Sequence, residues 1–298
     1  MLIGKTQSVC PTCGTTCPAV LVEADKVYLD TYCVMHGPSR GVVEPSVPFF
    51  HFVRTRWSPS IYDGVLLDVT RRCNARCSYC FQDLRGGADP SIEELVRRSS
   101  VIPTNYPIIL SGGEPTLRED LPEIVQELGK THPIVILTNG FKVDFSLPAA
   151  WVLSYHSETF WSFDAALRLE GQFFSIIYTA DSPEEFLNYL GSCLKLRQRA
   201  QSFRIHSVAP VGANHGGQGS RLYLSEMVGL AKQSHDVELV GPGKTVYFPT
   251  KIDGVDMKLV SWSSKYDIDL IDLACPPFYL TDRGMEHLVT TLVKREFQ

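Results

Sequence analysis

The chain has 298 residues, of which 44% are hydrophobic and 20% charged, so it can form one large domain or one domain with a small appendage. Its net charge of −5 gives no electrostatic signal for a nucleic-acid partner. No apolar run approaches the roughly eighteen residues of a membrane span, and the first residues lack the layout of a signal peptide, so we expect a cytoplasmic protein. Seven of the nine cysteines precede residue 81, which in the cytosol indicates metal or cluster ligands rather than disulfides.

The first 48 residues are rich in cysteine and turn-forming residues and predict a small metal-binding domain (residues 1–48). Two knuckles, Cys10-Pro-Thr-Cys13 and Cys33-Val-Met-His36, are separated by nineteen residues with the pattern of a β-hairpin. This spacing is close to that of a zinc ribbon, which holds Zn²⁺ in a tetrahedron of sulfur and nitrogen ligands. So short a segment needs metal binding in order to fold. The predicted zinc ligands are Cys10, Cys13, Cys33 and His36.

Cys17 leaves a second interpretation of this region open. The four cysteines before residue 34 could instead hold a second iron–sulfur cluster. We favour zinc because the knuckle spacing accounts for His36, which leaves Cys17 as a spare thiol.

Residues 49–63 are rich in aromatic side chains, as in a connector that packs on a larger body, and residues 64–298 form the main predicted domain. Short β-rich runs alternate there with helical patterns. Apolar strands between amphipathic helices indicate a parallel sheet that is covered by helices. The predicted strands are 65–70, 108–111, 134–138, 151–155, 174–178 and 203–208. The predicted helices are 91–99, 120–130, 158–169, 183–199 and 225–234.

The last part of the chain has a different pattern. Two β-rich runs, 246–251 and 255–262, flank the pair Asp253-Gly254, which is a strong signal for a β-hairpin. The fold class is therefore α/β with a C-terminal hairpin. Six βα units fit either a doubly wound sheet or an incomplete barrel, and periodicity alone does not choose between them.

Three thiols, those of Cys73, Cys77 and Cys80, lie within eight residues directly after the first strand of this domain. Such spacing suits a [4Fe-4S] cluster, in which each iron is held by one thiolate. Three ligands leave one iron with an open position at which a substrate can bind. The alternatives are a structural zinc ion or three buried thiols, but zinc would want a fourth protein ligand nearby and none follows before His132.

With this CxxxCxxC motif, and with the aromatic Tyr79 before the third cysteine, the chain resembles the radical S-adenosylmethionine (SAM) superfamily. The Gly-Gly-Glu motif of that family is present as Gly112-Gly113-Glu114 at the end of the second predicted strand. Two motifs in the right order, each after the right strand, are more specific than either alone. In isolation, the second motif reads equally well as a helix-entry turn with Pro115 early in the helix.

The resemblance implies a partial (β/α)6 barrel of the TIM type, with ligands at the C-terminal ends of its strands. It implies an enzyme whose [4Fe-4S] cluster, on Cys73, Cys77 and Cys80, cleaves SAM reductively to a 5′-deoxyadenosyl radical that abstracts hydrogen from a substrate. The electron would come from an external donor such as flavodoxin or ferredoxin. In this family the glutamate and glycine backbone hold the SAM amino group, and residues on strands four and six contact the ribose and the adenine. The implied SAM-binding residues are Tyr79, Gly112, Gly113, Glu114, Ser154 and Val208.

The substrate stays unidentified at this stage. A similar cysteine-rich leader occurs in radical SAM enzymes that act on lipid chains or methylate pterins, and peptide modification is a further alternative. His156 and His206 are candidates for facing the substrate cavity, residues 212–219 for a mobile loop and Cys275 for a further ligand, although structural roles are the default for all of them. From another class, the chain could be a zinc-dependent binding module on a barrel that no longer cleaves SAM, but the intact motifs argue against that.

Overall fold

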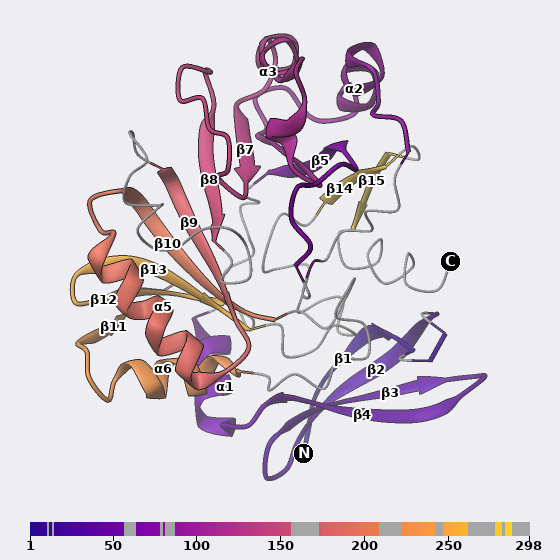
Figure 1. Cartoon of the computed structure of the whole chain (residues 1–298). Helices are drawn as coiled ribbons and strands as arrows, with labels where there is room; N and C mark the ends of the chain where they lie inside the picture. Colours follow the sequence, from indigo (N-terminus) through magenta and orange to yellow (C-terminus); the bar gives the residue numbers. More distant parts are fainter. Residues whose placement is uncertain are drawn as a thin grey trace.

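The computed structural model describes residues 1–10, 12–13, 15–56, 64–77, 80, 87–155, 173–208, 222–241, 247–261, 278–281 and 284–287. Two sheets organise these residues: a small antiparallel sheet at the N-terminus and a large, mostly parallel sheet with helices on its outer side (Figure 1). None of the helices in the described part is long and apolar enough to cross a membrane.

The N-terminal sheet has four antiparallel strands in the order β1-β2-β3-β4. They are β1 (Leu2–Val9), β2 (Thr16–Glu23), β3 (Val27–Cys33) and β4 (Gly37–Glu44). Alternate side chains of β3, including Val27 and Leu29, are buried in a small core of their own. The hairpin predicted between the two knuckles is present as β2 and β3.

A helix that the sequence did not predict, α1 (Val47–Thr55), begins just before the predicted connector. Its N-cap is Ser46, whose hydroxyl accepts a hydrogen bond from the backbone of Phe49, and its first turn contains a proline, as is common in helices. Phe50 of α1 is buried in the small core of the N-terminal sheet, whereas Val53 belongs to the main core. The aromatic segment therefore joins the two parts by packing on both.

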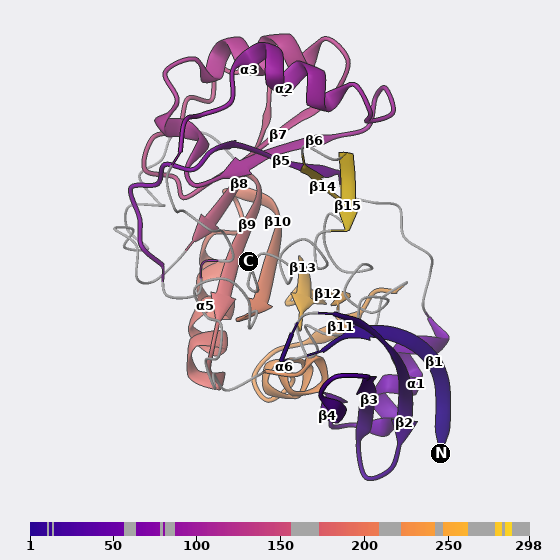
Figure 2. The ribbon, with the colours of Figure 1, turned by 90° about the vertical axis from the view of Figure 1, so that its right-hand side faces the viewer.

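A buried carboxylate also joins the two parts. Glu44, the last residue of β4, accepts hydrogen bonds from the hydroxyl and the backbone N–H of Ser225, in the first turn of α6. It also accepts one from the backbone N–H of Ser46. Burial raises the pKa of the Glu44 carboxyl, against the opposing effect of these hydrogen bonds. Figure 2 shows α6 beside the N-terminal sheet.

The main sheet contains six parallel strands in chain order, from β5 to β10. The strands are β5 (Val65–Thr70), β6 (Ile108–Gly112), β7 (Ile134–Thr138), β8 (Ala150–Tyr155), β9 (Phe173–Ala180) and β10 (Ala200–Ser207). In a doubly wound sheet the order of the strands reverses at a switch point. The strands here follow one another in chain order without such a reversal, which confirms the partial barrel. In the described part, other strands flank both β5 and β10, and the sheet does not close.

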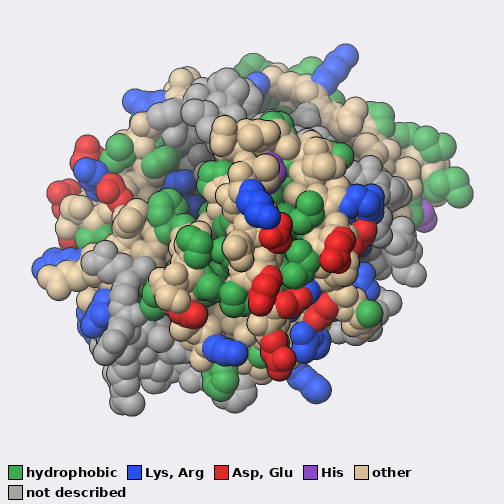
Figure 3. Space-filling view, turned by 90° about the horizontal axis from the view of Figure 1, so that it is seen from above, with side chains coloured by type: hydrophobic (Ala, Val, Ile, Leu, Met, Phe, Trp, Pro, Cys, Tyr) green, Lys and Arg blue, Asp and Glu red, His purple; other side chains and the backbone are tan. Residues whose placement is uncertain are grey.

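The helices that cover this sheet follow the predicted pattern. They are α2 (Ile92–Ser99), α3 (Leu121–Gly129), α5 (Pro183–Lys195) and α6 (Leu224–Ala231), and a short turn of 3₁₀ helix, η1 (Pro115–Leu117), follows β6. Figures 1 and 2 agree that α2, α3 and α5 lie on the convex side of the curved sheet. On the face seen in Figure 3, acidic and basic side chains are interspersed, so no large patch of one sign marks it. The helix predicted at 158–169 lies outside the described residues.

The predicted C-terminal hairpin is present, and it extends the main sheet. It consists of β12 (Tyr247–Ile252) and β13 (Val255–Val260), joined by Asp253 and Gly254 with φ angles of 49° and 78°. Two consecutive positive φ angles are typical of a hairpin turn of type I′. At one edge of the parallel strands, β13 pairs in parallel with β10, and β12 pairs with β11 (Val237–Leu239). At the other edge, a second hairpin pairs with β5; it consists of β14 (Phe278–Thr281) and β15 (Gly284–His287). Of these strands, β11, β14 and β15 were not predicted, nor was the pairing of the predicted hairpin with β10.

Candidate functional site

The cysteine motif follows β5 at the carboxyl edge of the parallel sheet, where ligands bind in folds of this type. Cys73, Cys77 and Cys80 are all partly exposed. The backbone N–H of Cys80 donates to the carbonyl oxygen of Cys77 at 3.2 Å, and that of Ala75 donates to the sulfur of Cys73 at 3.4 Å. No disulfide joins any of the eight cysteines that lie among the described residues. Tyr79 lies outside those residues.

The two glycines of the second motif are needed because backbone passes close by. A Cβ on Gly112, whose φ is 113°, would lie 2.1 Å from the carbonyl oxygen of Thr70, and a Cβ on Gly113 would lie 2.0 Å from that of Arg72. Hydrogen bonds fix this approach: the N–H of Gly113 donates to Thr70 and the N–H of Glu114 to Arg72, both at 2.8 Å. The neighbour that excludes a side chain is therefore the start of the cysteine loop itself.

Glu114 is 1% exposed, and four donors of the protein hold its carboxylate. Oε1 accepts from the N–H and the hydroxyl of Thr116 and from the hydroxyl of Thr138, which ends β7. Oε2 accepts from the N–H of Asn139 at 2.7 Å. An ionised carboxylate has about two acceptor sites on each oxygen, so beyond the contacts of the described residues Oε2 can accept one more donor, such as an ammonium group.

A second connection joins Glu114 to the cysteine loop. The side-chain amide of Asn139 donates to Oδ1 of Asn74 at 2.7 Å, and Asn74 directly follows Cys73. Burial raises the pKa of the Cys73 thiol, and the negative charge of Glu114 raises it further. The two motifs thus meet at one site, although Cys73 and Glu114 are 41 residues apart in the chain.

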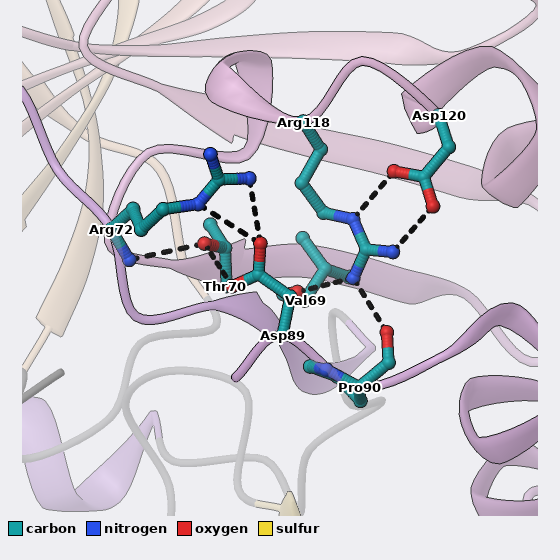
Figure 4. Close-up of polar contacts among 7 residues, drawn as sticks. All are labelled: Val69, Thr70, Arg72, Asp89, Pro90, Arg118 and Asp120. Atoms are coloured by element: carbon teal, nitrogen blue, oxygen red, sulfur yellow. Dashed lines mark hydrogen bonds and ion pairs between the residues drawn. The ribbon is translucent and has the colours of Figure 1, made fainter. Parts of the chain in front are cut away.

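Asp89 fixes the returning end of the cysteine loop (Figure 4). Its carboxylate accepts from the hydroxyl of Thr70 at 2.7 Å and from the guanidinium of Arg72 at 3.0 and 2.6 Å. Burial opposes the ionised form of Asp89, but these hydrogen bonds outweigh it and lower the pKa of its carboxyl. The two ends of the loop that carries Cys73, Cys77 and Cys80 are therefore held together.

Arg118 extends this network and is 6% exposed. Nη1 donates to the carbonyl oxygens of Val69 and Pro90 at 2.7 and 2.8 Å, and Nε and Nη2 donate to the carboxylate of Asp120 at 2.8 and 2.6 Å. One guanidinium thereby joins β5, the approach to α2 and the segment after η1 (Figure 4). The sequence did not single out Asp89 or Arg118, because nothing in its pattern separates them from solvated loop charges.

The other residues that the resemblance implied for SAM lie at the same edge of the sheet. Ser154 is the fifth residue of β8 and is partly buried. Val208 directly follows β10, and its N–H donates to the carbonyl oxygen of Ala180 at 3.1 Å. Their contacts with SAM stay predictions. His156, residues 212–219 and Cys275 fall outside the described residues.

The four predicted zinc ligands lie together, with their donor atoms all within 4.8 Å of one another. Nδ1 of His36 lies 3.6 Å from the sulfur atoms of both Cys10 and Cys33, and the Cys13 and Cys33 sulfur atoms are 3.9 Å apart. A tetrahedron with zinc–ligand bonds of about 2.3 Å to sulfur and 2.0–2.1 Å to nitrogen has edges of about 3.8 and 3.6 Å. The measured separations fit a zinc ion held by these residues.

Cys17 is buried next to this group without belonging to it. Its thiol donates to the carbonyl oxygen of Thr15 at 3.1 Å. Burial raises the pKa of the Cys17 thiol, and the neighbouring cysteines raise it further. At Cys33, burial also opposes ionisation, but hydrogen bonds from His36 and the backbone outweigh it and lower the pKa to about 6. The arrangement favours zinc over a second iron–sulfur cluster, because it includes His36 and leaves Cys17 outside.

Comparison with known families agrees with both sites. Residues 67–153 match the model of the radical SAM superfamily, and residues 2–44 match that of the HMPTM N-terminal zinc ribbon domain. The first match begins within β5 and ends within β8, so it includes both motifs. The second ends at Glu44, the last residue of β4.

Curated relatives match parts of the chain. The 7,8-dihydro-6-hydroxymethylpterin dimethyltransferase of Methanocaldococcus jannaschii is 29% identical over 47% of this chain and 34% of its own. The GTP 3′,8-cyclase of Haemophilus ducreyi is 36% identical over 28% of this chain and 27% of its own. The chain thus spans about a third or less of the length of these relatives. Among solved structures, Streptococcus suis SuiB bound to precursor peptide SuiA is 14% identical, with a TM-score of 0.44 over 58% of this chain and 45% of SuiB. The chain is therefore similar to the radical SAM superfamily over residues 67–153 and to the HMPTM N-terminal zinc ribbon domain over residues 2–44.

Proposed function

We propose that this protein is an enzyme that binds a [4Fe-4S] cluster on Cys73, Cys77 and Cys80 and cleaves SAM reductively. When bound, the cluster supplies the electron that breaks the C5′–S bond of SAM. In the proposal, Oε2 of Glu114 accepts a hydrogen bond from the ammonium group of the SAM methionine, while Ser154 contacts the ribose. Val208 contacts the adenine, and Tyr79 is a further residue proposed to bind SAM. An external electron donor, a flavodoxin or a ferredoxin, reduces the cluster.

One observation carries this proposal: the carboxylate of Glu114 is joined through Asn139 to Asn74, beside the first cysteine of the loop. The four hydrogen bonds that hold the carboxylate fix its position before any ligand arrives, which is the preorganisation that a binding group needs.

For the substrate, we propose a pterin, with methylation as the reaction. Of the two curated relatives described above, the one that covers the larger share of this chain is a dihydrohydroxymethylpterin dimethyltransferase, and the N-terminal segment matches a zinc ribbon named for HMPTM. In the same proposal, Cys10, Cys13, Cys33 and His36 bind zinc, which stabilises the ribbon and takes no part in the reaction.

Anaerobic reconstitution tests the reaction. The chain should bind about four irons on the three cysteines of the loop, and with dithionite and SAM it should form 5′-deoxyadenosine. The Cys77→Ala variant should lose both properties. Cys193→Ala is the matched control, because Cys193 is buried in α5 and belongs to the main core. Zinc as the sole metal, or no 5′-deoxyadenosine above the level of Cys77→Ala, would favour the binding module instead.

A further inference from the structure

The side-chain amide of Asn74, directly after the first cysteine of the loop, is only half used by the protein. Its oxygen Oδ1 accepts a hydrogen bond from the amide of Asn139 at 2.7 Å. An asparagine amide also has an NH₂ group with two donors. Within the described part of the chain, no acceptor lies within hydrogen-bond distance of this NH₂ group. The Asn74 side chain is partly exposed, so the NH₂ group is available to a ligand.

Asn139 determines which end of the Asn74 amide is left for a ligand. Oδ1 of Asn139 accepts from the N–H of Phe141 at 3.1 Å, so the NH₂ group of Asn139 is the end that faces Asn74. The backbone N–H of Asn139 donates to Oε2 of Glu114 at 2.7 Å. If the Asn74 amide turned over, two NH₂ groups would face each other. The orientation of the Asn74 amide is therefore fixed before a ligand arrives.

The neighbouring donor side chains hold carboxylates of the protein itself, those of Glu114, Asp89 and Asp120. These donors are the hydroxyls of Thr70, Thr116 and Thr138 and the guanidinium groups of Arg72 and Arg118. The NH₂ group of Asn74 differs from them, because no carboxylate of the described residues accepts from it.

The distance between Asn74 and Glu114 suits the two charged groups of an α-amino acid. Two hydrogen bonds of 2.7 Å, with the single residue Asn139 between them, connect Oε2 of Glu114 to Oδ1 of Asn74. In an amino acid, one carbon separates the ammonium group from the carboxylate, and a charge-assisted hydrogen bond at each end adds about 2.8 Å. The two spans are comparable.

We propose that the NH₂ group of Asn74 binds the carboxylate of the SAM methionine, while Glu114 binds its ammonium group. This inference rests on the proposed function, because it takes SAM as the ligand. A donor for the carboxylate is needed at this place, since the negative charge of Glu114 repels that of the ligand. Asn139 contacts both binding residues and is a positioning residue for them.

Calorimetry with SAM and with decarboxylated SAM tests this assignment, because the second ligand keeps the amino group and the sulfonium and lacks the carboxylate. Both are titrated anaerobically into the reconstituted full chain. Asn74→Asp keeps an oxygen for the amide of Asn139 and replaces only the NH₂ group. We expect this variant to bind SAM about tenfold or more weakly, as for one lost charge-assisted hydrogen bond. Decarboxylated SAM should bind at least as tightly as to the wild type.

A second variant tests the same donor from its neighbour. Asn139→Asp places an oxygen where the NH₂ group of Asn139 faces Asn74, so the Asn74 amide should turn over to donate to it. The NH₂ group is then lost to the ligand, and SAM should again be the ligand that binds more weakly. The matched control is Asn188→Asp, on the exposed side of α5, which should leave both affinities unchanged.

Iron analysis identifies the variants that hold a full cluster, and the comparison is made in those. Selective loss of affinity for SAM supports the assignment, whereas equal loss for both ligands, or no loss for either, overturns it. If Asn74→Asp does not hold its iron, Asn139→Asp decides in the same way. The absence of 5′-deoxyadenosine from the wild type would refute the proposed function. Its formation, together with normal SAM binding by Asn74→Asp, would refute only the role of Asn74.

Discussion

The space that a side chain on Gly113 would need is taken by the carbonyl oxygen of Arg72, 2.0 Å from the Cβ position. Neither backbone can move aside easily, because the N–H of Glu114 donates to that same carbonyl. Gly113→Ala should therefore displace the start of the cysteine loop and prevent stoichiometric binding of the cluster, which iron analysis and the visible absorbance measure.

Gly191→Ala is the matched control for that substitution. Gly191 lies inside α5, a Cβ there has no atom within 4 Å, and alanine is favoured over glycine in a helix by about 1 kcal/mol. We expect this variant to bind iron normally and to unfold at a higher urea concentration. If Gly113→Ala also retains its full iron content, the close approach is not needed for the site.

Removal of the Arg118 guanidinium should destabilise the main domain. Arg118→Met leaves the carbonyl oxygens of Val69 and Pro90 without this donor and the carboxylate of Asp120 without its cation. Because the side chain of Asp120 is 43% exposed and stays solvated, the main cost is that of the two carbonyl oxygens left without a donor, about 1–3 kcal/mol. Urea unfolding followed by circular dichroism measures the change.

The control for Arg118→Met is Arg98→Met. Arg98 pairs with Glu94 one helical turn away, and such an i,i+4 pair contributes about 0.3–0.5 kcal/mol. Equal destabilisation by both variants would show that the network around β5 contributes no more to the free energy of unfolding than an exposed ion pair on a helix.

The same network predicts an acid dependence of stability. The hydrogen bonds from Arg118 lower the pKa of the Asp120 carboxyl below its ordinary value of 3.8, against a smaller effect of burial. A carboxyl with a lowered folded-state pKa stabilises the fold at pH values above 3.8, and this contribution is lost as the pH falls through the folded-state pKa. The difference in unfolding free energy between the wild type and Asp120→Asn should therefore be constant from pH 7 to pH 5 and shrink below that. A difference that does not change down to pH 2 would contradict this assignment.

Glu114→Gln should weaken SAM binding by about tenfold or more, the effect of one lost charge-assisted hydrogen bond. The amide removes the negative charge, and its NH₂ group would face the donors of either Thr138 or Asn139. Calorimetry of the reconstituted protein measures the affinity. The control is Glu127→Gln. Glu127 is exposed on α3 and pairs with Lys130, so the variant should bind SAM like the wild type.

Zinc content distinguishes the two interpretations of the N-terminal cysteines. Cys33→Ala should lose the zinc ion and unfold the ribbon, which limited proteolysis would detect, because the metal supplies much of the folding free energy of so small a sheet. Cys17→Ala should keep one zinc per chain, since Cys17 lies outside the group of ligands. Loss of metal from Cys17→Ala, or iron in place of zinc, would support the second cluster.

Much of this structure could be predicted from the sequence, because the strands of a parallel sheet are short apolar runs with clear ends. The strand predicted at 134–138 has those bounds in β7. Helix α1 was missed because its aromatic residues suggested a connector, and they do pack on both sides of it. The strands β14 and β15 were missed because a strand of four residues has too few side chains to show a period.

The sites were predictable to a different degree. The cysteine and glycine motifs have fixed spacings and were recognised, although the reason for the glycines is the nearby backbone of Thr70 and Arg72. Asp89 and Arg118 could not be identified, since their importance lies in contacts with residues far apart in the chain.

The carboxylate of Glu44 has a consequence for how the protein responds to its metals. By accepting from the backbone and the hydroxyl of Ser225, it completes the first turn of α6 with an acid from the far end of the chain. Any ion that binds only the folded ribbon shifts the unfolding equilibrium of everything coupled to the ribbon. We therefore expect metal binding at the N-terminal site to raise the thermal stability of the parallel sheet as well as that of the ribbon.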